Sequence, residues 1–519
     1  MRSNLDNETK SNRCVCPEER EDRELLVLSP GHWILLALAF WGYDSVCYLL
    51  PAPVGTVLAF MLGAAILGLS AVNFVRGLNF FLVVLIFSDD ISRMDPMGGA
   101  AGAANMLTVS LQGVALSNFL AIALLVIGLL TGLMGHTNRK QAFGWVALDG
   151  CVAGILILYL AAVVHGLGWL FSNPRGALND LNLPLMLCGF YFIVRLHATC
   201  IGALVRLWHT IFLAMAAKTL VWAIWLVLGI GVEFGTSLRV SFESGRVLLV
   251  FVFLVGLVLQ NRSLHLSVRA RGTSLIISMT AALNLLMNAS GGPWLMSLYG
   301  LGCLFAFGRV QDKILWVVVG CFCVVIVAGG LLIFNPSAYE TIGHFADTLK
   351  VWDPERVASS HSTMVRAYGL LNIHAQLKDD GKLLLGEGPG SLFTDAYRPF
   401  PFSLHGGDYR ETEILSRKFQ NPHGLLANLM LNVGYGGMII YLGLIFVGYL
   451  SVIVAFLRAE GEGVLRAMSL ALIAFLPAMV YSAWSSKNTM LLGTLLGMGG
   501  CLCALLRPGE ARLKRTIAP

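Results

Sequence analysis

An arginine and a histidine within one polar segment are the residues of this chain best suited to chemistry. Arg366 lies in the stretch 362–373, and His423 lies in the run Asn421-Pro422-His423-Gly424-Leu425-Leu426. An arginine guanidinium carries a permanent charge and a planar fork of donors that fits phosphate oxygens. A histidine can accept a proton near neutral pH. We therefore expect any chemistry to take place in the polar segment that these residues belong to, residues 335–422.

The same segment contains a glycine-rich turn and one candidate helix. Gly386, Gly388 and Gly390 alternate with other residues, a pattern that permits a tight turn and a close approach of backbones. No strand precedes these glycines, so the pattern is not a nucleotide-binding fingerprint. Apolar residues near helical spacing over 362–377 predict an amphipathic helix on the outer face of a membrane.

The composition predicts the elements that must position this segment. Hydrophobic residues make up 56% of the 519 residues and charged residues only 13%, whereas about a quarter of the residues of a soluble protein are charged. Apolar runs that could cross about 30 Å of hydrocarbon recur along the chain. Because the runs are continuous rather than alternating, helices are preferred to a β-barrel. The spans are expected to begin near Gly31, Val54, Phe74, Leu107, Trp145, Pro184, Thr210, Arg246, Thr273, Pro293, Ile314, Leu425, Ala467 and Asn488.

We therefore predict an all-α, polytopic transmembrane helical bundle of about 12–14 spans with one large extracytoplasmic loop. Its parts are a cytoplasmic tail over 1–30, a transmembrane bundle of about 11 spans over 31–334, a large periplasmic loop over 335–422, further spans over 423–506 and a basic cytoplasmic tail over 507–519. Lys and Arg are concentrated in alternate short connections and in the C-terminal tail, which predicts that both termini are cytoplasmic. The net charge of +6 then reflects loops facing anionic lipid, and a nucleic-acid partner is not implied.

Several other polar residues have two open interpretations. Arg195 and Lys218 fall inside apolar runs, where they either line a substrate path or extend their charges to the membrane surface. Asp89 and Asp90 are expected to be solvated loop charges. The loop aromatic residues either form a sugar-stacking surface or anchor the loop at the membrane; they are Tyr397, Phe400, Phe402 and Tyr409. The loop histidines lack the spacing of metal ligands; they are His344, His361, His374 and His405.

Three sequence features are shared with one group of membrane enzymes. Arg366 is followed by a Leu-Leu-Gly-x-Gly turn that ends at Gly388, and Pro422-His423 leads into an apolar run containing Gly434 and Gly437. In an earlier outer loop, Arg239 precedes a span, with Arg246 as the alternative at the same boundary. In these features the chain resembles the O-antigen ligase and O-antigen polymerase superfamily of bacterial inner membranes.

The chain departs from that superfamily at two positions. Members commonly have Asn after the loop histidine, where this chain has Gly424. Many also carry Ser-Arg-Gly in the pair of spans before the loop, where this chain reads Ser290-Gly291-Gly292. The second departure leaves the choice between ligase and polymerase open.

The resemblance implies a GT-C-type glycosyltransferase of the bacterial inner membrane. Such an enzyme transfers a glycan from undecaprenyl diphosphate to a sugar hydroxyl on lipid A-core or on a growing polysaccharide. It would work in membrane lipid, without a cofactor, beside other polysaccharide-assembly proteins. Because no Asp-x-Asp metal motif occurs in an outer loop, we expect arginines to neutralise the charge in place of a metal. By the resemblance, His423 would be the base and Arg366 a catalytic clamp on the diphosphate. Arg239 or Arg246, with Gly386 and Gly388, would bind substrate.

A transporter or flippase of lipid-linked glycan is the competing hypothesis. Many spans and intramembrane charges are equally expected of that class. Transporters tend to show repeated halves with paired broken helices, whereas no clear internal repeat is seen here and the large loop is asymmetrically placed. The enzyme is therefore preferred.

Overall fold

The computed structural model describes residues 30–507, apart from short gaps and the longer stretches 89–104, 319–360 and 401–408. His423, Asp89, Asp90, His344, His405 and Phe402 lie outside the described residues. The described chain is mostly helical, with three two-stranded sheets as its only sheets within these ranges.

The helices before the polar loop account for most of the predicted spans. They are α2 (Pro30–Leu49), α3 (Ala52–Val72), α4 (Phe74–Phe87), α5 (Leu116–Asn138), α6 (Ala147–His165), α7 (Leu167–Ser172), α8 (Pro174–His197), α9 (Ile201–Val227), α10 (Glu243–Val258), α11 (Val268–Met287) and α12 (Gly291–Phe307). The strands in this part are β1 (Ser110–Leu111), β2 (Val114–Ala115), β3 (Val232–Phe234) and β4 (Ser237–Arg239). The expected span from Ile314 lies largely outside the described residues.

The polar loop and the end of the chain contain the remaining elements. They are α16 (His361–Asp379), β5 (Phe393–Thr394), α17 (Glu411–Ser416), β6 (Lys418–Phe419), α18 (Leu425–Arg458), α19 (Gly463–Ser482) and α20 (Ser486–Leu505). Among the described residues, seven helices are long and apolar enough to cross a membrane: α3, α6, α8, α9, α18, α19 and α20. Five shorter apolar helices accompany them. The prediction of an all-α, membrane-embedded protein is confirmed.

Three predicted boundaries are wrong. The run expected from Thr210 starts nine residues earlier, at Ile201. The run expected to start near Leu107 begins as the β1–β2 hairpin, and its helix starts at Leu116. The run expected from Pro184 starts at Pro174, because the side chain of Asn173 accepts a hydrogen bond from Gly176 N and caps a helix that has proline in its first turn. Pro184 is therefore inside α8.

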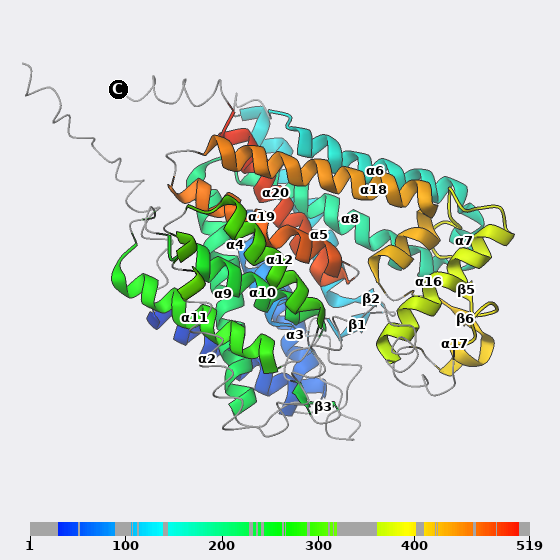
Figure 1. The fold of residues 1–519 in the computed structure, drawn as a ribbon, viewed down its shortest axis with the longest axis horizontal. Helices are drawn as coiled ribbons and strands as arrows, with labels where there is room; N and C mark the ends of the chain where they lie inside the picture. The colour runs from blue at the N-terminus through cyan, green and yellow to red at the C-terminus, as the bar shows by residue number, and fades with distance from the viewer. Residues whose placement is uncertain are drawn as a thin grey trace, which may run out of the picture.

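Helix α20 is the centre of the bundle and is enclosed on nearly all sides. It packs along α8 through small residues. A Cβ on Gly493 would lie 2.4 Å from the carbonyl oxygen of Leu187, and a Cβ on Gly497 would lie 2.8 Å from that of Tyr191. Glycines four residues apart thus let the two backbones approach closely, as is common between membrane helices. Helices α6, α8 and α18 run along one side of the molecule (Figure 1).

The intramembrane Arg195 is held in an internal ion pair. Its Nε donates to Asp149 Oδ1 at 2.9 Å, and a second guanidinium nitrogen donates to Asp149 Oδ2 at 3.1 Å. The hydroxyl of Tyr191 also donates to Asp149, at 2.6 Å. Both charged side chains are buried. The charge of Arg195 is thus satisfied within the core and does not extend to the membrane surface.

Two buried lysines meet at the C-terminal end of α4. Lys218 Nζ, from α9, donates to the carbonyl oxygen of Phe87 at 2.9 Å. Lys487 Nζ, from the first turn of α20, donates to the carbonyl oxygens of Ile86 at 3.0 Å and Ser88 at 2.7 Å. A helix end carries unsatisfied carbonyls and partial negative charge, so ammonium groups stabilise it there. Lys218 is thus a structural cation.

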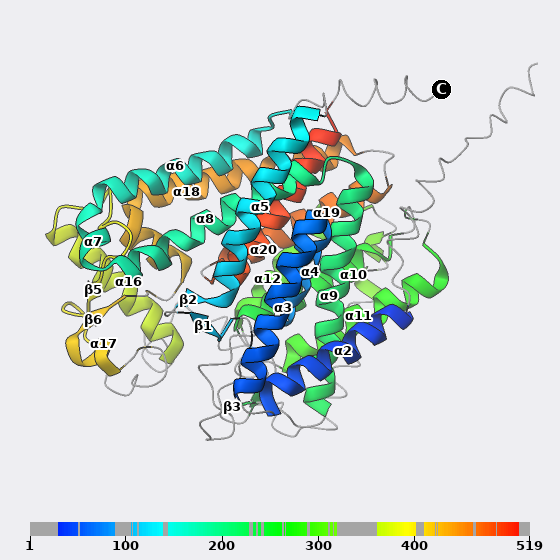
Figure 2. The same cartoon turned by 180° about the vertical axis from the view of Figure 1, so that it is seen from behind.

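The described part of the polar loop forms a small unit at one end of the bundle (Figures 1 and 2). The predicted helix is confirmed as α16, and the two-stranded β5–β6 sheet lies close to it. Its core is aromatic and includes Phe393, Phe400, Tyr409 and Phe419. Because Phe400 and Tyr409 are buried, neither can stack on a sugar; Tyr397 is exposed.

Candidate functional site

The glycine-rich turn fastens the polar loop to a break in α18. At Gly434 the backbone leaves the helical conformation, with φ of 68°. The break removes two helical hydrogen bonds, from the amides of residues 435 and 436 to the carbonyls of residues 431 and 432. The amides of Tyr435 and Gly436 donate instead to the carbonyls of Leu383 and Leu384, at 2.8 and 3.1 Å.

The two carbonyls freed by the same break are also satisfied by the loop. Glu387 N donates to the carbonyl of Leu431 at 2.7 Å, and Gly388 N donates to that of Asn432 at 3.2 Å. The loop therefore supplies both donors and both acceptors that the broken helix needs. We call this set of contacts between residues 383–388 and residues 431–436 the α18 seam.

Glycines are required in the α18 seam because two backbones touch there. A Cβ on Gly386, whose φ is 72°, would lie 2.5 Å from Gly434 N. A Cβ on Gly388 would lie 2.5 Å from the Cα of Gly166, in the turn between α6 and α7. The predicted tight turn and close approach are confirmed, and the backbone approached is the protein's own. The role of Gly386 and Gly388 in substrate binding stays a prediction.

A buried carboxylate, which the sequence analysis did not single out, holds the end of the glycine turn. Asp180, near the start of α8, accepts a hydrogen bond from Gly390 N at 2.8 Å. The carbonyl of the same glycine accepts a hydrogen bond from Nδ2 of Asn173, the residue that caps α8, at 2.8 Å. The segment 386–390 is thus fixed to α18, to the α6–α7 turn and to α8, so the loop is rigidly placed over one end of the bundle.

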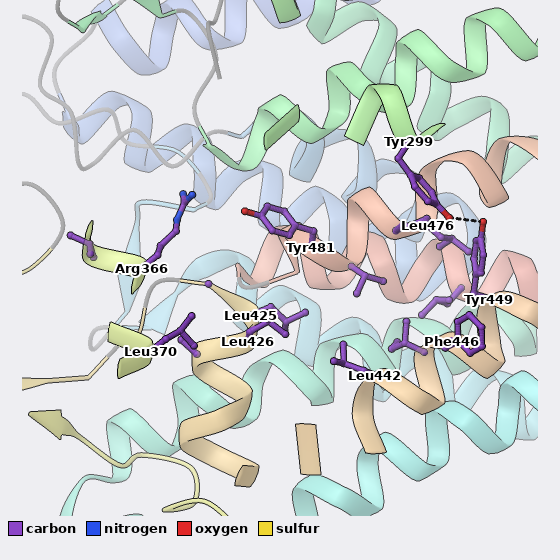
Figure 3. A pocket seen from close by; sticks show the side chains of 17 residues that line it. Tyr299, Arg366, Leu370, Leu425, Leu426, Leu442, Phe446, Tyr449, Leu476 and Tyr481 are labelled. Carbon is purple, nitrogen blue, oxygen red and sulfur yellow. Dashed lines mark hydrogen bonds between the residues drawn. The ribbon is translucent and has the colours of Figure 1, made fainter. Parts of the chain in front are cut away.

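The described residues line an apolar pocket of about 550 Å³ directly beside this loop. Its sides come from α12, α18 and α19, and α16 covers one end (Figure 3). The residues that line it are Tyr299, Val365, Arg366, Leu370, Gly424, Leu425, Leu426, Ala427, Leu442, Ile445, Phe446, Tyr449, Leu476, Pro477, Val480, Tyr481 and Leu496. The volume is within the range of ligand-binding pockets, roughly 300–1,000 Å³.

One of the two predicted catalytic residues lines this pocket. Arg366 projects from the first turns of α16 and is exposed at the loop end of the pocket (Figure 3). Gly424 also lines it. His423 itself lies outside the described residues, but its bonded neighbour Gly424 is placed in the same pocket as Arg366. With φ of 112°, Gly424 adopts a conformation that asparagine rarely reaches, which gives a physical reason for the departure at this position.

A tyrosine hydroxyl at the same end of the pocket was missed by the sequence analysis. Tyr481, near the end of α19, lies between Arg366 and the deeper part of the pocket, and its hydroxyl is directed toward the side on which Arg366 lies (Figure 3). A Cβ on Gly292 would lie 3.9 Å from the Tyr481 ring. Gly292, the last residue of the predicted departure, therefore lies in the neighbourhood of this ring. Nothing in the spacing of residues marks Tyr481, which is one aromatic residue of an apolar run.

The other two predicted arginines, Arg239 and Arg246, lie on β4 and α10, which follow each other in the chain. Arg239 ends β4 and pairs with Val232 across the β3–β4 hairpin. Arg246 is half-buried in the first turns of α10 and is not among the described residues that line the pocket. Their role in substrate binding stays a prediction.

Among the described residues, no three His, Cys, Asp or Glu side chains form a group that could hold a metal ion. No protein-family model matches the chain, and a comparison with curated proteins finds no match.

Proposed function

We propose that this protein is a membrane glycosyltransferase that moves a glycan from undecaprenyl diphosphate to an acceptor sugar hydroxyl, as an O-antigen ligase or polymerase does. The observation that carries the proposal is the placement of Arg366 at one end of an apolar pocket between membrane helices. A ligand with an anionic head and a long apolar tail matches both parts of that pocket. A lipid-linked diphosphate has this form.

The two parts of the pocket would hold different parts of the donor molecule. Its apolar length is lined by α18 and α19, both long enough to cross a membrane, whereas Arg366 comes from the polar loop. The isoprenoid tail would lie against the helices, and the diphosphate would lie near the guanidinium, which binds phosphate oxygens with two parallel donors. The α18 seam fixes the loop to the helix that lines the pocket, so head and tail sites keep a constant separation.

In the transfer step, His423 and Arg366 would have separate roles, one at the acceptor and one at the leaving group. The acceptor oxygen attacks C1 of the donor sugar and forms the new glycosidic bond, while the bond from C1 to the diphosphate oxygen breaks and its electron pair leaves with the lipid diphosphate. His423 would take the proton from the acceptor hydroxyl. Arg366 would stabilise the charge that grows on the leaving diphosphate. Transfer by these two residues needs neither a metal nor a cofactor.

The remaining features of the proposal concern partners and place. The acceptor is either lipid A-core or a growing polysaccharide, and other polysaccharide-assembly proteins would deliver or extend the donor. The reaction would take place at the periplasmic face of a bacterial inner membrane, with both termini in the cytoplasm. Arg239 or Arg246 would be a second contact for the substrate.

The test is a gel profile of surface glycan, with undecaprenyl-linked intermediates quantified, in cells lacking the protein and in cells complemented with His423→Ala. Full-length polymer stranded on undecaprenyl diphosphate identifies a ligase. Single repeat units stranded there, or added singly to the lipid core, identify a polymerase. Loss of a general base typically costs about 100-fold or more, so His423→Ala should behave as the deletion does although the protein accumulates in the membrane.

Two results would contradict the proposal. Normal glycan in the His423→Ala strain would remove the assigned base. Intermediates trapped on the cytoplasmic face of the membrane would indicate a flippase instead, because a transporter acts before the donor reaches the periplasmic face.

A further inference from the structure

The pocket ends where two helices are joined by a pair of tyrosines. Helices α12 and α18 both pack against α19, so α19 forms the back of the pocket and the other two form its sides. At their far ends α12 and α18 meet, with the rings of Phe307 and Phe456 centred 5.8 Å apart. Nearer the pocket, the hydroxyls of Tyr299 and Tyr449 lie 3.1 Å from each other (Figure 3). The two tyrosines therefore line the end of the pocket opposite Arg366.

A proline in α19 explains why Tyr449 is held at that place. Pro477 lies inside α19 and has no amide hydrogen, so the carbonyl of Ile473, four residues earlier, loses its helical donor. The hydroxyl of Tyr449 donates to this carbonyl at 3.1 Å. A carbonyl without a donor inside a membrane bundle is costly, so this hydrogen bond fixes the Tyr449 side chain across the pocket.

The donor roles in the tyrosine pair follow from this contact. A tyrosine hydroxyl has one proton, and Tyr449 uses it for the Ile473 carbonyl, which can only accept. Tyr299 must therefore donate to the Tyr449 oxygen. Cys303 Sγ lies 3.7 Å from the same oxygen. We call the hydrogen-bonded pair Tyr299–Tyr449 the tyrosine clasp.

We propose that the tyrosine clasp determines specificity by setting how much of the isoprenoid tail next to the diphosphate the pocket can hold. This inference rests on the proposed function and names a feature of the donor that the same site selects. With the diphosphate at Arg366, isoprene units closest to it run along α18 past Leu442 and Phe446 until they meet the clasp. Units beyond that point turn aside into the lipid and make no contact with the pocket walls, so they contribute nothing to discrimination.

The experiment measures binding of isoprenoid diphosphates with tails of one, two, three and four isoprene units to the full-length protein in detergent. Each variant is compared with the wild type at the same length, so partition of longer tails into detergent cancels in the ratio. The variants are Tyr449→Ala and Tyr299→Ala. The matched controls are Leu450→Ala and Leu298→Ala, exposed neighbours on the same helices that do not line the pocket.

We expect the variants to bind the shortest tails as the wild type does and to bind the longer tails at least about tenfold more tightly, because each isoprene unit newly enclosed gains close packing contacts with the pocket walls that fluid detergent chains do not provide. The two leucine controls should give a ratio near one at every length. Tyr299 is partly exposed, so its truncation leaves no sealed cavity, and it keeps the test decisive if Tyr449→Ala does not fold.

Failure of this inference can be told apart from failure of the proposed function. If the wild type binds the diphosphates and the ratio for both tyrosine variants is flat with length, the clasp does not limit the tail. If the wild type binds none of the four compounds, the pocket is not a lipid-diphosphate site, and the clasp proposal falls with the proposed function.

Discussion

Gly386 and Gly434 touch backbone to backbone, so closely that a Cβ on either residue would lie 2.5 Å from backbone atoms of the facing segment. This contact joins the polar loop to the break in α18. It is the reason why the loop that supplies Arg366 and the helix that lines the pocket behave as one unit.

We expect Gly386→Ala to destabilise the protein by about 3 kcal/mol or more. An alanine here must adopt a positive φ that is unfavourable for it, and its methyl group collides with the backbone of α18. Gly381→Ala is the matched control. Gly381 has a similar φ of 67° but nothing within 4 Å of its Cβ position, so it should cost only about 1–2 kcal/mol. Thermal unfolding in detergent measures both. If the two variants lose the same stability, the backbones in the α18 seam can move apart without cost.

Arg366→Lys should lower transfer activity by about 10-fold to 100-fold, since a lysine supplies a point charge but not two parallel donors to a diphosphate. Arg398→Lys is the control, because Arg398 is an exposed arginine of the same loop that is not among the described residues lining the pocket. Surface glycan and membrane protein levels are measured together. Full activity in Arg366→Lys would reduce Arg366 to a surface charge.

Breaking the Arg195–Asp149 pair should be more harmful than removing it. Arg195→Met or Asp149→Leu alone leaves one buried charge uncompensated, at a cost of about 3–5 kcal/mol. The double variant should regain most of that loss, because replacing both charges with apolar side chains is often nearly neutral. A double-mutant cycle on thermal unfolding measures the coupling. A double variant as unstable as the sum of the single variants would contradict the assignment of a purely structural pair.

Asp380→Asn should stabilise the protein at pH 7. Burial of the carboxyl, and after it the neighbouring Glu387 carboxylate, raise the pKa of Asp380 above its ordinary value, and Lys382 opposes this. A raised pKa means that the folded state favours the protonated form, so ionisation of Asp380 costs stability as the pH rises through its folded-state pKa. The gain from Asp380→Asn should therefore shrink as the pH falls toward 4. Asp379→Asn, at the preceding residue, is the control, and thermal unfolding between pH 7 and pH 4 is the measurement.

The sequence predicted those features that depend on neighbouring residues. The periodicity over 362–377 identified α16, and alternating glycines identified the turn at 386–390. Apolar runs located most helices, and the suitability of a guanidinium for phosphate singled out Arg366 within the polar loop. The capping signal of Asn173 and Pro174 was available in the sequence and would have corrected the start of α8.

Contacts between distant residues could not be predicted in this way. The partners in the α18 seam are about fifty residues apart, and either segment alone has the sequence of an ordinary turn or helix. Tyr299, Tyr449 and Tyr481 come from three apolar runs, where aromatic residues are common and none is distinguished by spacing. The acidic partner of Arg195 lies 46 residues earlier, so the sequence left the role of that arginine open.

The lysine at the start of α20 has a consequence for the order of assembly. The ribosome makes α4 early and α20 last among the described helices, yet within the described ranges the ammonium donor to the carbonyls of Ile86 and Ser88 is Lys487. The early half of the bundle therefore waits in the membrane with an incompletely neutralised helix end until synthesis is nearly complete. A nascent chain cut short before residue 487 would keep that defect.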